Sequence, residues 1–591
     1  MCGIIGYNGK RNVKKILIEG LKALEYRGYD SAGIAISDGK NKEIIKSVGR
    51  VKALEDKVNN ESKMDGLFGI AHTRWATNGG VTLSNAHPHT NGKVTLVHNG
   101  IIENSDSLKE NLKKKGVKFY GDTDSEVVAA LINYYYKGDA LKAICDAVKD
   151  LEGSYALVIM FDGDTKLYAI RKDSPLIIGY GDNEFFAASD ISALGNKVKS
   201  IVYLDTNVVA VLSQKDIKYY KDLKEVKEKI VDIKNYNFDT SKGEYKHYML
   251  KEIMEEAQLV RCFLSKYLYS DFSEFDLTPY KYIDIVACGS AMHAGLAGKY
   301  IIEKYASIKV SVNMASEYRY EDKIYLDKEH TLIILISQSG ETADTIAALR
   351  EAKESGIKTL GIVNREGSTI ARESDMVIMT DAGIETAVAT TKAYIMQVLV
   401  LSLMGIKTSI KIGKLEKNVL DEYKKLPSLI ENVYSKKEEI KALANKVYKI
   451  DNCFFIGRLI DYAISMEASL KLKEVSYIHS ECYASGELKH GTISLIENGT
   501  VVFAIITDKN IKDKTLSNLK EVESRGARGI LITTDEFDIP YDLKLTLPYV
   551  EYFIEPMVVV PALQLLSYYV ADLRGCDIDK PKNLAKSVTV E

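Results

Sequence analysis

The sequence predicts an α/β multidomain protein, in which an N-terminal layered domain of mixed sheet and helix precedes two doubly wound α/β lobes. Three observations predict this fold class. Up to about Val231, short strand-like runs such as VTLVHNG and SYALVIM alternate with Gly, Asn and Asp turns. After Tyr245, strands are followed by long helices, the order of a doubly wound parallel sheet. That second half also repeats itself.

The first 231 residues are predicted to form one α+β domain. Two helical stretches interrupt its strands, at Val13–Leu24 and at 124–136. The segment 232–244, DIKNYNFDTSKGE, is polar and has no hydrophobic period, so we expect a linker there.

The repeat places two similar lobes after the linker. The segment from Tyr282 parallels the segment from Lys449, each being a strand, a glycine turn and a helix, and the segment from His330 parallels that from Thr500. Two copies of one lobe, about 168 residues apart, explain both matches. We therefore predict a first lobe with a leading helix at 245–420, a second lobe at 421–576 and a C-terminal tail or lid at 577–591.

Composition excludes several classes of protein. The 79 basic and 82 acidic residues give a net charge of -3 and are well mixed, which argues against a nucleic-acid partner. The seven cysteines form no CxxC pair, so we expect no disulfide framework and no zinc site, and a reducing cytoplasmic setting fits best. Without a GxGxxG turn, a P-loop or a metal-spaced cluster, no cofactor and no metal are expected.

No membrane association is expected either. The first residues, MCGIIGYNGKRN, lack the basic-then-apolar order of a signal peptide. The longest apolar runs, at 393–406 and 557–571, are interrupted by polar residues or Pro and fall short of about 20 residues. We expect them to be buried helices.

Cys2 is the first residue with candidate chemistry. Removal of Met1 would leave a thiol and an α-amine on one residue, and an amine with a pKa near about 7.7 to 8.0 can accept the thiol proton. The alternative is an ordinary buried thiol. Polar residues gather at turns in the segments 72–77, 85–89, 98–104 and 121–126, which favours a site.

Together these segments resemble the glutaminase domain of the class II, N-terminal-nucleophile amidotransferases, over about 230 residues. The resemblance implies that Cys2 is a nucleophile that forms a glutamyl thioester, and that the Asn99 side chain and the Gly100 amide hold the oxyanion. It implies that Arg74 pairs with the glutamine α-carboxylate and Asp124 with its α-amine. Without the resemblance, these two would be a solvated ion pair. Further contacts implied with L-glutamine are at Thr77 and His87, and Asn78 stands where the family commonly has His.

The segment SQSGET lies between a predicted strand and a predicted helix, so its amides and hydroxyls meet the positive end of the helix. This arrangement predicts a phosphate-binding loop, while the alternative is a routine helix cap. The side chains that converge there are those of Ser337, Gln338, Ser339 and Thr342.

This motif and the duplicated lobes resemble the sugar isomerase (SIS) domain. The segment 466–491 further resembles the catalytic stretch of the glutamine–fructose-6-phosphate aminotransferase (isomerising) family, and the DKPKNLAKSVTVE tail extends the match to essentially the whole chain. The resemblance implies transfer of ammonia from glutamine to fructose 6-phosphate with isomerisation, which gives glucosamine 6-phosphate and glutamate in the first step of hexosamine synthesis.

The resemblance also assigns roles in the sugar half. It implies that His490 opens the ring, that Glu474 moves a proton with help from Lys471, and that Lys586 contacts the open-chain carbonyl. Glu467, Lys471 and Glu474 recur at i, i+4 and i+7 and share one helix face, which is otherwise typical of a solvated salt-bridge face. Sugar-phosphate contacts are implied at Ser290, Val388 and Ala389. Departures from the family pattern occur at Ala291, Thr390 and Thr492.

By the same resemblance, Trp75 gates a path for ammonia between the two sites, and His490 reaches the sugar site of a neighbouring subunit in a homodimer. Two alternatives remain. One is an aminotransferase or deglycase that acts on another keto-sugar phosphate. The other is a regulatory protein that binds sugar phosphate and has kept an idle glutaminase fold.

Overall fold

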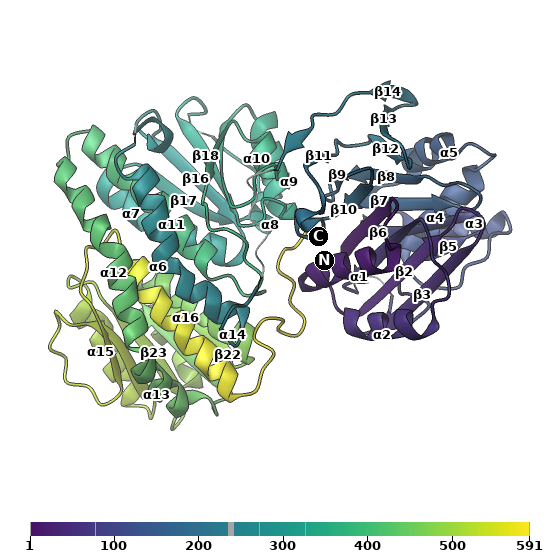
Figure 1. Ribbon diagram of the computed structural model, residues 1–591. Coiled ribbons are helices and arrows are strands. Elements are labelled where there is room, and N and C mark those ends of the chain that lie inside the picture. Colours follow the sequence, from purple (N-terminus) through teal and green to yellow (C-terminus); the bar gives the residue numbers. More distant parts are fainter. Residues whose placement is uncertain (1, 77–78, 234–240, 271, 326, 590–591) are drawn as a thin grey trace. The chain divides into compact units, whose positions relative to one another are not determined.

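A computed structural model describes residues 2–76, 79–233, 241–270, 272–325 and 327–589. The chain divides into two compact units. Unit 1 comprises Met1–Asp239 with Ser587–Glu591, and unit 2 comprises Thr240–Lys586. Figure 1 shows the elements of both units, and each unit is described by itself.

Unit 1 contains two antiparallel sheets packed face to face. Side chains from both sheets, such as Ile70 of β4 and Val158 of β7, form one apolar layer between them. The first sheet has the order β15 (Val231–Asp232), β11 (Ser200–Tyr203), β9 (Ile177–Tyr180), β10 (Phe185–Ala188), β1 (Gly3–Asn8), β4 (Phe68–Arg74), β2 (Ser31–Ser37) and β3 (Lys42–Val48). The second has the order β14 (Lys224–Val226), β13 (Ile217–Lys221), β12 (Val209–Leu212), β8 (Leu167–Lys172), β7 (Gly153–Phe161), β6 (Val94–Ile102) and β5 (His89–Asn91).

Helices cover the outer face of each sheet in unit 1. The helices α1 (Val13–Leu24) and α2 (Val51–Glu61) pack on the first sheet, and α3 (Ser105–Lys114), α4 (Asp124–Tyr135) and α5 (Ala140–Ala147) pack on the second. The two predicted helices are confirmed as α1 and α4. The other three were missed because they are short, and α2 and α3 are strongly charged and bury few side chains each.

Unit 2 contains two parallel five-stranded sheets with the same strand order. Both follow the order 2-1-3-4-5 within their lobe, which confirms the predicted duplication of a doubly wound lobe. The first sheet is β17 (Lys309–Met314), β16 (Tyr282–Ala287), β18 (Thr331–Ser337), β19 (Lys358–Val363) and β20 (Met376–Met379). The second is β22 (His479–Ala484), β21 (Asn452–Gly457), β23 (Val501–Ile506), β24 (Arg528–Thr534) and β25 (Lys544–Leu547).

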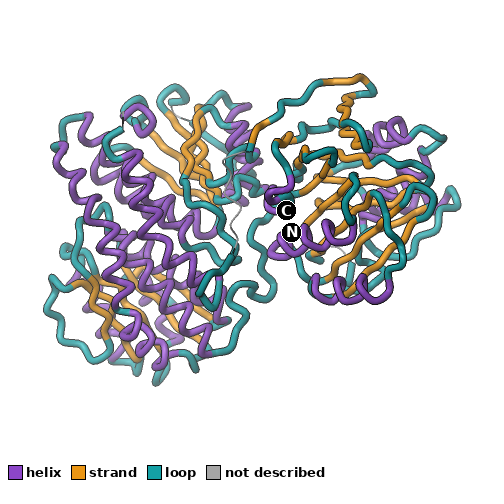
Figure 2. Tube along the Cα trace, viewed as in Figure 1, coloured by secondary structure: helices purple, strands orange, loops and turns teal. Residues whose placement is uncertain are grey.

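The two lobes share one hydrophobic core. In Figure 2 the helices of unit 2 fill the space between its two sheets. The central ones are α7 (Gly289–Ala306), α11 (Lys392–Lys411), α14 (Ile460–Ser476) and α16 (Glu555–Leu573). The remaining helices are α6 (Tyr248–Tyr267), α8 (Ala315–Tyr318), α9 (Ala343–Glu354), α10 (Thr369–Glu373), α12 (Asp421–Ser435), α13 (Lys437–Val447) and α15 (Lys512–Glu523).

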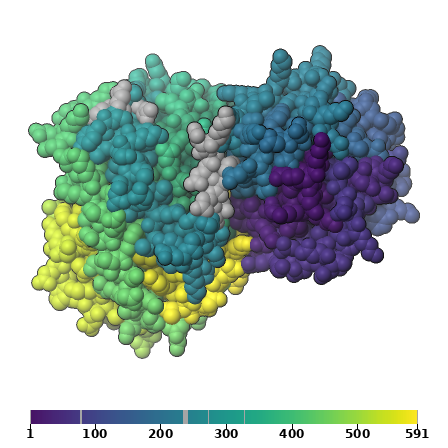
Figure 3. Space-filling model, viewed as in Figure 1, coloured from purple at the N-terminus to yellow at the C-terminus, as the bar shows by residue number. Residues whose placement is uncertain are grey.

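Two of these helices, α11 and α16, are long and apolar enough to cross a membrane by length and composition alone. Their apolar windows are 94% and 83% buried inside the protein. The prediction that both apolar runs are buried helices is therefore confirmed. Figure 3 shows α6 and α12 at the surface of unit 2, where their outer faces meet solvent.

Candidate active sites

The first candidate site surrounds Cys2, immediately before β1. Since β1 pairs antiparallel with β4, the chain beyond Arg74 passes beside the thiol. The amide of Trp75 donates to Cys2 Sγ at 3.2 Å, and the thiol donates to the Trp75 carbonyl at 3.4 Å. Burial raises the pKa of the Cys2 thiol. The sulfur is held in place, and it needs a base to become a nucleophile.

Asn99 and Gly100 are consecutive residues of β6, and the Asn99 side chain contacts Cys2. The Asn99 amide donates to the Cys2 carbonyl at 2.9 Å, and its own oxygen faces His72 Nε2 at 3.2 Å, which fixes the direction of the amide group. Gly100 has a φ of 131°, and a Cβ added there would lie 2.0 Å from the Ser154 carbonyl oxygen. Only glycine fits at this position.

Arg74 and Asp124 are both buried, so they are not the solvated ion pair of the alternative interpretation. The guanidinium donates to the carbonyls of Gly79 and Gly80 at 2.9 and 3.0 Å. Asp124 begins α4, and its Oδ2 accepts the amide of Ile102 at 3.0 Å. Thr77 and Asn78 lie outside the described residues.

Four buried histidines line this region. The His72 and His87 rings contact each other in a tilted arrangement with centroids 3.9 Å apart. Burial lowers the pKa of His72 to about 3 and that of His87 well below its usual value. Burial also lowers the pKa of His89 and of His98, whose Nδ1 lies 2.8 Å from the Ser125 hydroxyl. These imidazoles are therefore neutral near pH 7.

Trp75 contributes both backbone and ring to the Cys2 region. Its indole is half-buried and contacts Tyr29 edge-on, with the ring centroids 5.6 Å apart. The backbone of Trp75 therefore fixes the sulfur, while its ring lies beside a second aromatic side chain.

The second candidate site begins at the loop after β18. This loop joins β18 to α9, as predicted, at the edge where strand order reverses and where doubly wound folds bind ligands. The Ser337 hydroxyl lies 2.9 Å from the Thr342 hydroxyl and accepts the Gly340 amide at 3.0 Å. The Ser339 hydroxyl accepts the Glu341 amide at 3.2 Å. Internal hydrogen bonds thus preshape the loop before any anion is bound.

Gly340 and Glu341 fix this loop against the rest of the lobe. Gly340 has a φ of 64°, and an added Cβ would lie 2.0 Å from Ser368 Oγ. The Glu341 carboxylate accepts the amide and the hydroxyl of Thr369 at 2.8 and 2.9 Å. The backbone of Gln338 accepts the amide of Asn364 at 3.3 Å.

On the Glu467, Lys471 and Glu474 face of α14, Glu467 and Lys471 are buried and Glu474 is half-buried, so this is not a solvated face. Lys471 forms an ion pair with Glu474 and lies 3.6 Å from Glu467. Burial acts to lower the pKa of Lys471, but the two carboxylates raise it above its ordinary value, so the lysine stays charged. Glu467 also accepts the Ser290 hydroxyl and faces His293 Nδ1, each at 2.9 Å. Helix α14 of the second lobe is thereby bonded to α7 of the first.

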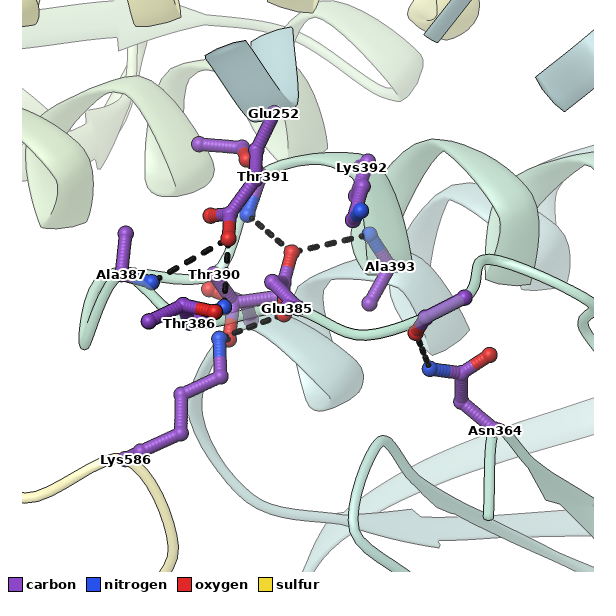
Figure 4. Close-up of polar contacts among 12 residues, drawn as sticks. Glu252, Asn364, Glu385, Thr386, Ala387, Thr390, Thr391, Lys392, Ala393 and Lys586 are labelled. Atoms are coloured by element: carbon purple, nitrogen blue, oxygen red, sulfur yellow. Dashed lines mark hydrogen bonds and ion pairs between the residues drawn. The ribbon is translucent and has the colours of Figure 1, made fainter. Parts of the chain in front are cut away.

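Lys586 and the loop before α11 complete this group (Figure 4). The Lys586 amine forms an ion pair with Glu385 and lies 3.4 Å from the Thr390 hydroxyl. Val388 and Ala389 are buried in the same loop, and the Val388 amide donates to the Asp579 carbonyl at 3.0 Å.

His490 lies apart from these contacts. It ends the 3₁₀ turn Glu487–His490, its side chain is exposed, and it has no hydrogen-bond or ion-pair partner in the part of unit 2 that the structure describes. Thr492 begins the next turn, Thr492–Leu495. Ala291 is partly buried in the first turn of α7 and packs against the shared core.

Sequence reasoning missed Glu385 as a site residue, Glu252 as a support of the loop that carries Glu385, and His293 as a partner of Glu467. A weak signal was present, since Glu252 and Glu256 are acidic residues with i, i+4 spacing on the face of α6 that carries apolar residues. Nothing in the sequence pairs that helix with the loop at Glu385, because the contact spans more than one hundred residues.

Comparison with known proteins gives concordant results over the whole chain. The SIS domain family matches residues 276–407 and 446–571, and the glutamine amidotransferase domain family matches residues 76–196. The chain is 47% identical to the glutamine–fructose-6-phosphate aminotransferase (isomerizing) of Clostridium tetani and 42% identical to that of Methanosarcina acetivorans. Both alignments cover 100% of each chain.

A solved structure, the C-terminal domain of glucosamine-fructose-6-phosphate aminotransferase from Francisella tularensis, is 38% identical with a TM-score of 0.55. The match covers 57% of this chain and 99% of that one. The predicted fold class, an N-terminal-nucleophile glutaminase domain followed by two SIS lobes, is confirmed. The full-length identity, the two domain families and the shared fold together show that this chain belongs to the glutamine–fructose-6-phosphate aminotransferase (isomerizing) family.

Proposed function

We propose that the chain is an enzyme that releases ammonia from L-glutamine and transfers it to fructose 6-phosphate, with isomerisation to glucosamine 6-phosphate. The observation that carries this proposal is the combination in one chain of a thiol fixed beside the Asn99 amide with a preshaped hydroxyl loop at a sheet switch point. The full-length similarity to aminotransferases of this name supports it.

In the glutaminase half, removal of Met1 would expose the α-amine of Cys2. That amine takes the thiol proton, because the neighbouring histidines are buried and His72 has a pKa of only about 3. The sulfur then attacks the glutamine amide carbon, ammonia leaves, and water hydrolyses the thioester. Asn99 and Gly100 stabilise the oxyanion, and each such donor contributes about 10²- to 10³-fold in rate.

Glutamine itself would be held by its charged ends. Arg74 and Asp124 are the buried cation and anion of the region, so they suit the α-carboxylate and the α-amine respectively. His87, neutral and in contact with the His72 ring, would form part of the pocket wall, and Thr77 is assigned to it by family similarity.

In the sugar half, Ser337, Gln338, Ser339 and Thr342 would hold the phosphate, with Ser290, Val388 and Ala389 contacting the sugar. His490 opens the ring, ammonia attacks C2 of the ketose, and the C2 oxygen leaves as water to give an imine. Glu474 then moves a proton between C1 and C2, and the charged Lys471 beside it stabilises negative charge that develops on the sugar oxygen. Lys586 contacts the open-chain carbonyl.

A homodimer is part of this proposal. The exposed His490, which has no partner within the described part of its own unit, is available to the sugar site of a second copy. We also propose, by family similarity, that Trp75 gates a shielded path for ammonia, since ammonia that escapes to water near neutral pH is protonated and no longer nucleophilic. A cytoplasmic setting agrees with the seven free cysteines.

We propose five segments with these boundaries: a glutaminase domain at 1–231, a linker at 232–244, a first SIS lobe at 245–420, a second SIS lobe at 421–576 and a C-terminal tail at 577–591. They agree with the end of β15 at Asp232 to within one residue and with the start of α12 at Asp421.

The test follows glutamate and glucosamine 6-phosphate in parallel. Cys2→Ala should abolish both products from glutamine, whereas Glu474→Gln should abolish the amino sugar and leave glutamate release. Cys262→Ala, at an exposed thiol, is the matched control and should change neither. Amino-sugar formation by Cys2→Ala at the normal rate, or an active protein that retains Met1, would refute the proposal. Competition between fructose 6-phosphate and other ketose phosphates tests the choice of sugar.

A further inference from the structure

Glu385 is the carboxylate that contacts the amine of Lys586. One oxygen, Oε2, accepts from Lys586 Nζ, and the other, Oε1, accepts the amides of Thr391 and Ala393 at 3.0 and 3.2 Å. These amides belong to the N-cap and the first turn of α11, whose positive end favours a negative charge. Both Lys586 and Glu385 are almost fully buried, with side chains 3% and 0% exposed.

A second carboxyl lies behind the same loop. Glu252 of α6 accepts the amides of Thr386 and Ala387, as Figure 4 shows. Its Oε2 is buried and has no hydrogen-bond partner within the described residues. Glu252 and Glu385 thus both accept backbone amides from the segment 386–393.

The cations near this loop are already paired. Lys586 is bound to Glu385, and Lys392 donates to Glu255 at 2.7 Å. Glu252 has no cation of its own, and an unpaired buried carboxylate is costly, so it is held as the neutral acid. Burial, followed by repulsion from Glu385, raises the pKa of Glu252 to about 8. Burial also acts on Glu385, but Lys586 overcomes it and lowers the pKa of Glu385 below its usual value.

We infer that Glu385 is a positioning residue that holds and accepts the proton of Lys586, and that Glu252 stays protonated behind it so that one carboxylate alone faces the amine. The inference rests on the proposed role of Lys586 at the sugar carbonyl. The step is a single proton transfer. The proton moves from Lys586 Nζ to Glu385 Oε2, which leaves a neutral amine and a neutral acid, and the freed lone pair faces the sugar carbonyl.

The groups around Glu252 determine the pH at which it ionises beside Glu385. Helix α11 presents Lys392 and the tail presents Lys586, and both favour ionisation of Glu252, while burial and Glu385 oppose it. On its own helix the next acid is Glu256, whose pKa burial raises well above its usual value. Gln564 of α16 and Tyr434 of α12 are neutral groups that interact with Glu256 from helices packed against α6. Glu252 therefore ionises only as pH rises through about 8, and a second negative charge then forms beside Glu385.

The experiment compares two isosteric variants of the full chain, Glu385→Gln and Glu252→Gln. Glu385→Gln keeps an oxygen for the two α11 amides but cannot take the proton, so amino-sugar formation should fall by about 10²-fold or more in kcat, with glutamate release unchanged. Glu252→Gln reproduces the neutral acid, so its synthesis rate at pH 7 should stay within about threefold of the parent. Its pH profile should also lose the decline that the parent shows above about pH 8. Glu385→Asp should restore part of the rate.

Thermal unfolding and glutamate release establish that each variant is folded. Equal losses of synthesis in Glu252→Gln and Glu385→Gln would overturn the inference. Such a result would mean that both carboxyls are ionised in the working enzyme, whereas the inference requires Glu252 to be protonated. A normal rate in Glu385→Gln would also overturn it. Lys586→Ala separates this result from a failure of the proposed function. If Lys586→Ala makes the amino sugar normally, the role of Lys586 itself is wrong, whereas loss of synthesis there with a normal Glu385→Gln rejects only the inference.

Discussion

A second buried carboxyl pair, Asp461 and Glu555, makes the stability of unit 2 depend on pH. The Thr507 hydroxyl lies between them and is hydrogen-bonded to both. A hydroxyl has one proton to donate, so one of the two carboxyls must donate to it and must be protonated. Burial raises the pKa of Asp461 to about 7 and raises that of Glu555 well above its usual value.

The raised pKa values of Asp461 and Glu555 determine whether the free energy of unfolding rises or falls with pH. The folded chain retains protons that the unfolded chain loses once pH exceeds about 4.5, so the free energy of unfolding decreases as pH rises. Each retained proton costs about 1.4 kcal/mol per pH unit. Glu555→Gln removes at least one such proton and keeps a donor for Thr507. Between pH 6.0 and 7.5 the parent should therefore lose about 2 kcal/mol more than the variant.

The assay is urea unfolding of the full chain at both pH values, followed by circular dichroism. Glu551→Gln is the matched control, since Glu551 precedes α16 by a few residues and is exposed. It should lose stability with pH as the parent does. A Glu555→Gln variant whose stability falls as steeply as that of the parent would show that the carboxyl pair is not protonated, and the reasoning would be refuted.

Three further predictions concern the two sites. Ser290→Ala removes a hydrogen bond to the buried Glu467 carboxylate, so kcat for amino-sugar formation should fall by about tenfold with unchanged glutamate release, as measured by assaying the two products separately. Gly340→Ala places a methyl group 2.0 Å from Ser368 Oγ at a φ of 64°, so the KM for fructose 6-phosphate should rise by about tenfold or more in steady-state kinetics, and an unchanged KM would place the phosphate elsewhere. Asn99→Ala should lower kcat for glutamate release by about 10²- to 10³-fold with a nearly unchanged KM for glutamine, and a loss confined to KM would contradict an oxyanion role.

Much of the fold could be predicted from the sequence because the signals are local. Hydrophobic runs and glycine turns identified the strands around SQSGET, and the internal repeat predicted two lobes of equal topology, which the strand orders confirm. The charged helices α2 and α3 escaped detection because each buries only a few side chains. The sharing of one core by both lobes was also not visible, since it depends on α7, α11, α14 and α16 packing together across long sequence separations.

In the candidate site, too, some features could be predicted from the sequence and others depend on packing. Spacing placed Glu467, Lys471 and Glu474 on one helix face, but only packing against α7 shows that this face is buried and bonded to Ser290 and His293. The residue types that handle protons, phosphate and glutamine were therefore determined by the sequence alone, because side-chain chemistry belongs to each residue. Which carboxyls are ionised, and which lysine each one holds, was decided by the tertiary structure, because a pKa depends on burial and on charges brought close from distant parts of the chain.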